Sequence, residues 1–97
     1  MLRHVVMWKL AASDPTERVA QAQQIADRLN ALQGVVPEIV AISAGPGMAE
    51  GDWHAALIVD VAGRDALASY AAHPAHQKVL TYIRSVVAER AAVDFEF

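Results

Sequence analysis

The chain has 97 residues, no cysteine and a net charge of −3, with 55% hydrophobic and 20% charged residues. These values fit one globular domain, taken as residues 1–97, and exclude a disordered chain. Without cysteine there is no disulfide and no thiolate zinc site, and without a dense basic run we expect no nucleic-acid or anionic-membrane partner. No apolar run reaches the ~20 residues of a membrane span and no signal-peptide pattern is visible, so we expect a cytoplasmic protein.

Residues 2–10 are rich in β-forming residues and contain no breaker, which predicts a first strand. One side of this strand carries an imidazole and three large apolar side chains, those of His4, Val6, Trp8 and Leu10. Asp14 is a good N-cap and Pro15 suits the first helical position, so a helix is predicted to follow. We expect this helix to end at Gly34.

Two further strands are predicted at residues 39–44 and 53–61, then a short helix at 64–72, a longer helix from Pro74 and a last strand at 92–97. The order β-α-β-β-α-α-β predicts an α+β, ferredoxin-like fold, with a four-stranded antiparallel sheet and helices on one face. The first three strands carry apolar residues on both sides, so the face without helices needs a cover. We expect a second copy of the sheet to provide it, in a symmetric homodimer.

The segment from Tyr70 to His76 places a phenol and two imidazoles around Pro74. Proline disfavours a helix interior and keeps the preceding residue out of helical geometry. Tyr70 is therefore predicted near the end of one helix and His76 in the first turn of the next. Across such a break the two side chains can face a common point, and both residue types transfer protons. Tyr70 and His76 are thus the candidate catalytic pair.

Each of these residues also has a structural interpretation, which the sequence leaves open. His76 would then hydrogen-bond to nearby backbone, and the ring of Tyr70 would be half-buried with a local acceptor. His4 would be a satisfied core histidine. For His73, just before Pro74, the sequence favours a structural role as an N-cap or turn residue over ligand binding. No metal site is expected, because His73 and His76 lack the i, i+4 spacing of helical ligand pairs and no second cluster appears. No nucleotide site is expected either, since the turn at residues 45–47 precedes a strand.

Three features together resemble the stress-responsive A/B barrel (Dabb) family over essentially the whole chain. They are the opening segment His4-Val5-Val6-Met7-Trp8-Lys9-Leu10, the His-Pro-Ala-His run within residues 70–76, and the order of the elements. The resemblance implies a dimeric α+β barrel. Within the family, the spacing of Tyr70 and His76 is similar to that in polyketide cyclases of the olivetolic acid cyclase type. Those enzymes close a linear polyketide by aldol condensation without a cofactor.

This similarity implies His76 as general base and Tyr70 as the residue that orients a carbonyl substrate. It implies a small hydrophobic pocket between sheet and helices, lined by His4 and, on the same side of the first strand, by Val6 and Trp8. Such a pocket should measure roughly 300 Å³ or more and be reached by both catalytic side chains. No cofactor is implied. The segments between these residues diverge from the cyclase type, and their alanines would shape a different cavity.

Two alternatives share the same barrel. One is a dimeric ligand-binding or stress-associated protein without chemistry, in which the cavity is collapsed or the two side chains satisfy each other and the backbone. The other is a cofactor-free quinol monooxygenase, a plan that usually has more aromatic pocket residues than this chain offers.

Overall fold

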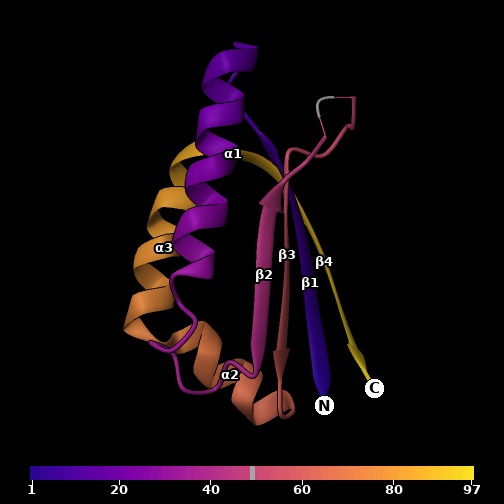
Figure 1. Cartoon of the computed structure of the whole chain (residues 1–97), viewed down its shortest axis with the longest axis vertical. Coiled ribbons are helices and arrows are strands. Elements are labelled where there is room, and N and C mark those ends of the chain that lie inside the picture. Colours follow the sequence, from indigo (N-terminus) through magenta and orange to yellow (C-terminus); the bar gives the residue numbers. More distant parts are fainter. Residues whose placement is uncertain (49) are drawn as a thin grey trace.

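The computed structural model describes residues 1–48 and 50–97 and has the predicted order of elements (Figure 1). The four strands are β1 (Leu2–Leu10), β2 (Ala41–Pro46), β3 (Ala55–Val61) and β4 (Val87–Glu96). The three helices are α1 (Pro15–Asn30), α2 (Arg64–Ala72) and α3 (Pro74–Val86). Every strand pair is antiparallel and the order across the sheet is β2-β3-β1-β4, which confirms the ferredoxin-like α+β fold.

The helices cover one face of the sheet and leave the other face without a helix (Figure 1). The core lies between sheet and helices, and it contains alternate residues of β1 and β3 together with the apolar stripe of α1. Its most buried members include Val6, Trp8, Leu57, Val59, Ile25 and Leu29. Burying each large apolar side chain contributes about 1.5–3 kcal/mol. Among the described residues, none of the helices combines the length and the apolar character that crossing a bilayer requires.

The sheet face without helices, called the open face here, is largely apolar. Strand register places on it side chains from three strands: Val5, Met7, Ala56, Ile58, Ala91, Val93 and Phe95. Ile58 is 42% exposed, Val93 59% and Phe95 46%. At one end of this face the Arg3 guanidinium donates to Asp60 twice, from Nε to Oδ1 at 2.8 Å and from Nη2 to Oδ2 at 2.9 Å. Contiguous exposed apolar residues of this kind are typical of a contact surface.

Two boundaries near the first helix differ from the sequence prediction. Helix α1 ends at Asn30, and Gly34, with φ +82°, lies in the following turns and not at the helix end. Strand β2 is shifted by two residues, so that Pro46 falls inside it. Proline is tolerated there because β2 is an edge strand of the sheet, where a missing N–H breaks no second ladder.

The last two strands also differ from prediction. Strand β3 begins at Ala55 instead of residue 53, and β4 begins at Val87, five residues before the predicted start. Helix α3 passes directly into β4 between Val86 and Val87. No glycine, proline or asparagine marks this junction, so the sequence has no signal from which to place it.

Candidate functional site

The corner between α2 and α3 forms at the predicted break. His73 is extended, with φ −61° and ψ 134°, as expected for a residue before proline. Its Nδ1 accepts a hydrogen bond of 3.0 Å from the backbone N–H of Ala75, and Pro74 occupies the first position of α3. His73 therefore caps α3, which is the structural role that the sequence favours for it.

The break brings Tyr70 and His76 together. Their ring centroids lie 4.4 Å apart with an angle of 41° between the ring planes. Both residues are buried, with exposed fractions of 1% for Tyr70 and 7% for His76. The two rings are in contact, but no hydrogen bond joins them.

The hydrogen bonding of His76 determines which ring nitrogen is basic. Its Nδ1 lies 2.9 Å from the carbonyl oxygen of Ala71, and because a carbonyl only accepts, Nδ1–H is the donor. Burial lowers the pKa of His76; the hydrogen bond to Ala71 opposes this, and His4, Arg84 and Arg90 act in the same direction as burial. His76 is therefore neutral at physiological pH, with an unprotonated Nε2 that can accept a proton.

The hydroxyl of Tyr70 is buried and has no hydrogen-bond partner among the described residues. Burial raises the pKa of Tyr70 to about 12, so the hydroxyl keeps its proton at neutral pH. An unsatisfied buried polar group costs about 1–3 kcal/mol. Such a group in a native protein is commonly satisfied by water or by a ligand, because most buried polar groups have a partner.

A second polar pair lies next to His76. His4 of β1 and Asp94 of β4 are directly opposite in register, and His4 Nδ1 is hydrogen-bonded to Asp94 Oδ1. His4 lies close enough to His76 to affect its pKa. The structure thus groups four side chains from four elements, called the polar cluster here: Tyr70, His76, His4 and Asp94.

Asp94 is the member of the polar cluster that the sequence analysis missed. It alternates with Val93 and Phe95, and in an isolated strand the acidic side would be assigned to solvent. In the sheet, Asp94 faces the helices beside His4, while Val93 and Phe95 lie on the open face. The prediction of a covered open face rested on the first three strands; assigning Val93 and Phe95 to that face as well would have placed Asp94 on the side of His4.

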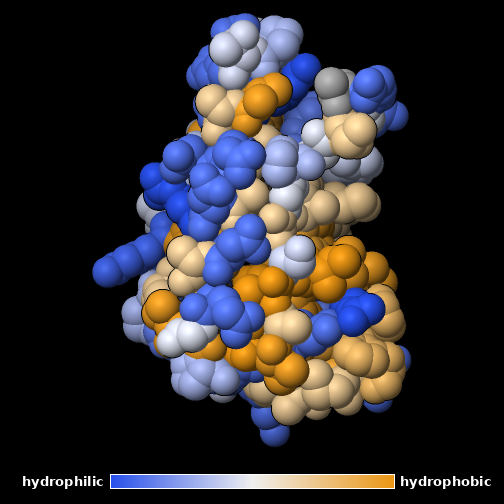
Figure 2. All heavy atoms as spheres, in the orientation of Figure 1, coloured by the Kyte–Doolittle hydropathy of each residue, from blue (hydrophilic) through white to orange (hydrophobic). Residues whose placement is uncertain are grey.

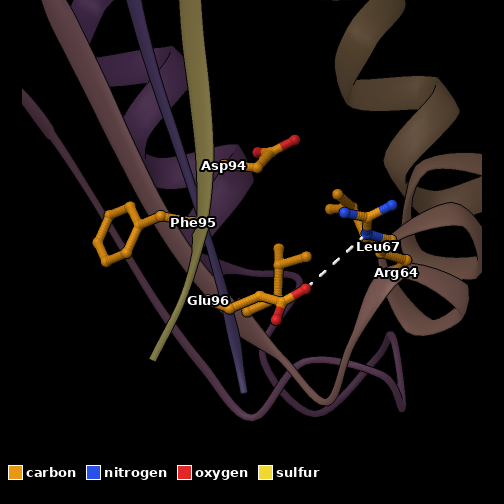
Figure 3. Close-up of a pocket in the computed structure, with 6 residues that line it drawn as sticks. Arg64, Leu67, Asp94, Phe95 and Glu96 are labelled. Carbon is orange, nitrogen blue, oxygen red and sulfur yellow. Dashed lines mark ion pairs between the residues drawn. The ribbon is translucent and has the colours of Figure 1, made fainter.

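A cavity of about 540 Å³ borders the polar cluster at Asp94 (Figure 3). It is lined by residues of β1, β4 and α2: Leu2, Arg64, Leu67, Asp94, Phe95 and Glu96. In Figure 3, Asp94 and Glu96 point toward Arg64 and Leu67, whereas the Phe95 ring points to the other side of β4. The Arg64 Nε and Glu96 Oε1 atoms are 3.9 Å apart across the opening.

The pocket-lining residues predicted from the sequence do not line this cavity. Val6 and Trp8 are core residues, 1% and 3% exposed, and His4 is held in its pair with Asp94. A second cavity lies elsewhere, beside His54, and neither cavity is lined by Tyr70 or His76. Tyr70 and His76 are therefore packed into the interior, and a cavity borders the polar cluster on its Asp94 side. The described residues contain no group of three potential metal ligands.

The chain is similar in fold to several solved proteins. A dimeric protein of unknown function with a ferredoxin-like fold from Bacteroides fragilis is 28% identical, with a TM-score of 0.90, 99% of this chain covered and 95% of that chain. A dimeric ferredoxin-like protein from Thermobifida fusca is also 28% identical, with a TM-score of 0.80 and coverages of 99% and 90%. SnoaB from Streptomyces nogalater, a cofactor-independent oxygenase, is 16% identical, with a TM-score of 0.76 and coverages of 99% and 91%.

At 16% identity, the last of these similarities shows the fold alone. No curated protein matches the chain at a significant level. The family model of the stress responsive A/B barrel domain (Dabb) matches residues 2–97, almost the entire chain. The protein therefore belongs to the stress responsive A/B barrel domain family.

Proposed function

We propose that the protein is a cofactor-independent enzyme that removes a proton from a carbon next to a carbonyl group, as in aldol-type cyclisation. The proposal rests on Tyr70, whose buried hydroxyl has no partner among the described residues and whose ring packs against the neutral ring of His76. A substrate carbonyl oxygen would satisfy that hydroxyl. The unprotonated Nε2 of His76 is then the base available for the adjacent carbon.

The two side chains have separate roles in this reaction. His76 accepts the proton at Nε2, while its Nδ1–H bond to the Ala71 carbonyl holds the ring in place. Tyr70, with a pKa of about 12, keeps its proton and donates it as a hydrogen bond to the oxygen that gains charge in the enolate. The proposed substrate is small, apolar and carbonyl-containing, of the polyketide type.

Substrate access is proposed from the cavity that borders Asp94. Leu67 lines this cavity and lies one turn before Tyr70 on α2, so both residues are on the same side of the helix. We propose that a change of the Leu67 rotamer connects the cavity to the hydroxyl of Tyr70. The missing hydrogen bond between Tyr70 and His76 does not contradict the proposal, because catalytic hydrogen bonds often form or tighten only in the substrate complex.

The packed state also favours a second candidate function, a ligand-binding protein without chemistry. Its support is that neither described cavity is lined by Tyr70 or His76. In that function the cavity of about 540 Å³ holds the ligand and the polar cluster only shapes its wall.

Hydrogen–deuterium exchange at a simple ketone separates the two functions without knowledge of the natural substrate. The protein is incubated with 2-heptanone in D2O and exchange of the protons next to the carbonyl is followed by NMR. Under the enzymatic proposal, wild type accelerates exchange, and His76→Gln loses about 10²–10⁴-fold of that acceleration. Tyr70→Phe loses about 10²–10³-fold, the usual effect of removing one hydrogen-bond donor to a developing oxyanion.

His73→Asn is the matched control, because it removes a neighbouring imidazole while asparagine still caps α3. It should exchange the ketone as fast as wild type. If the ketone binds but exchanges equally in wild type and His76→Gln, the enzymatic proposal is wrong and the ligand-binding function is favoured.

The proposal includes a homodimer formed through the open face. Support comes from the exposed apolar residues of that face and from the similar proteins of Bacteroides fragilis and Thermobifida fusca, which are described as dimeric. Two sheets packed face to face would bury both apolar surfaces at a spacing of about 10 Å.

A further inference from the structure

A second cavity, of about 520 Å³, lies at the opposite end of the molecule from the polar cluster. It is enclosed by the first turns of α1 and by the connection between β2 and β3, which lie near each other at the upper end of Figure 1. Figure 2 shows hydrophobic residues among the hydrophilic ones over this end of α1. The lining consists of Pro15, Arg18, Val19, Ala22, Pro46, Gly47, Met48 and His54.

His54 is held rigidly in the wall of this cavity. Its backbone N–H donates to the carbonyl of Trp8 at 2.8 Å, and its carbonyl accepts from the N–H of Gly47 at 2.9 Å. Its side-chain Nδ1 accepts a third bond, of 2.8 Å, from the N–H of Leu10. Because Nδ1 is an acceptor, the neutral ring carries its proton on Nε2. The ring therefore offers a hydrogen-bond donor as its remaining polar group.

Arg18 supplies a positive charge to the same cavity. No ion pair joins Arg18 to a carboxylate in the part of the chain that the structure describes, and no acidic side chain appears in the described lining. Burial and the charges of Arg18 and Lys9 lower the pKa of His54, which keeps its imidazole neutral beside the guanidinium. The polar side chains of the cavity are thus donors, and they suit an anionic oxygen.

The rest of the lining is apolar. Val19 and Ala22 lie on one face of α1, and Met48 faces them from the connection after β2. The volume falls within the range of about 300–1,000 Å³ typical of small-molecule sites. We propose that this cavity binds an aliphatic monocarboxylate, with the carboxylate on Arg18 and His54 and the hydrocarbon chain along Val19, Ala22 and Met48. This site is separate from the polar cluster and does not depend on the proposed enzymatic activity.

The test is titration of the ¹⁵N-labelled full chain with decanoate, followed by two-dimensional NMR, with 1-decanol as the uncharged probe of equal chain length. We expect saturable shifts at Val19, Ala22 and the His54 ring nitrogens. We expect decanoate to bind about tenfold or more tightly than decanol, the effect of one charge-assisted contact. Arg18→Gln should remove that preference by weakening decanoate about tenfold and leaving decanol unchanged.

Arg28→Gln is the matched control, because it removes the same charge from the same helix at a position that packs over the Tyr82 ring, 4.1 Å away. It should bind decanoate as wild type does. Three results would each overturn the proposal: no saturable binding, equal affinity for the two probes, or decanoate shifts confined to the open face or to the cavity near Asp94. An unchanged affinity of Arg18→Gln for decanoate would also overturn the proposal.

Discussion

The hydroxyl of Tyr70 is buried without an acceptor among the described residues. It belongs to a ring that contacts His76, which burial keeps uncharged. A phenylalanine would fill the same space and avoid the cost of about 1–3 kcal/mol for an unsatisfied buried hydroxyl. A residue that costs stability in its resting state is typical of a functional site, where local rules are broken for chemistry or binding.

Tyr70→Phe is therefore expected to stabilise the protein while it impairs function. The free energy of unfolding should rise by about 1 kcal/mol, because the variant buries no unsatisfied hydroxyl. Urea unfolding at a fixed protomer concentration measures the change. Tyr82→Phe, which alters the half-buried tyrosine under Arg28, is the control and should change stability by less than about 0.5 kcal/mol. A clear loss of stability in Tyr70→Phe would mean that the hydroxyl is bonded in the resting protein.

Two histidines, the buried His76 and the half-buried His54, make stability depend on pH. His76 and His54 both have a pKa below the ordinary value, mainly because of burial. The unfolded chain binds these protons near pH ~6.5, and the folded chain binds them only at lower pH. Stability is thus fully present above pH ~6.5 and decreases as the pH falls below it, since protons then favour the unfolded state.

Urea midpoints measured from pH 7.5 down to pH 5 check this expectation. Wild type should lose stability over that interval, and His76→Gln or His54→Gln should lose less, each by the contribution of its own imidazole. Equal slopes in wild type and both variants would show that neither histidine titrates between the folded and unfolded states.

The helices and the first strand illustrate which elements a sequence specifies. The start of α1 and the break between α2 and α3 could be predicted because each depends on local chemistry: Asp14 with Pro15 in one case, His73 with Pro74 in the other. The contact between Tyr70 and His76 follows directly from that break. These features need no knowledge of distant parts of the chain.

Strand β4 illustrates what the sequence could not specify. Its first five residues, 87–91, have no turn signal before them, and their strand geometry comes from pairing with β1. The orientation of Asp94 likewise depends on which face of the sheet is covered, a property of the assembled sheet. The sequence also could not place His54 beside Arg18. The two residues are 36 positions apart in the chain, and only the packing of the folded protein brings them to one cavity.

At the scale of the whole molecule, the oligomeric state depends on whether the open face is covered by a second subunit. Ile58 and Val93 are exposed on it, and Arg3 forms its bidentate ion pair with Asp60 at the edge. In a face-to-face dimer these apolar side chains would be buried, with the ion pair as a polar contact near the rim.

Val93→Asp is expected to produce a monomer, because it places a carboxylate within that apolar surface, where the partner sheet would bury it unpaired. Light scattering should give twice the chain mass of 10.4 kDa for wild type and 10.4 kDa for the variant. Val35→Asp is the control: Val35 is 55% exposed in the turns after α1, away from the sheet face, and its variant should remain dimeric. A wild-type mass of one chain would contradict the homodimer.

The alternation of side chains along β4 connects the polar cluster and the open face through one stretch of backbone. Asp94 reaches toward His4, while its immediate neighbours, Val93 and Phe95, lie on the surface proposed to meet a second subunit. Separation of the subunits would free this edge strand on one side and loosen the carboxylate on the other. If the protein is the proposed dimeric enzyme, turnover per subunit should therefore fall on dilution, and protein concentration would regulate the reaction.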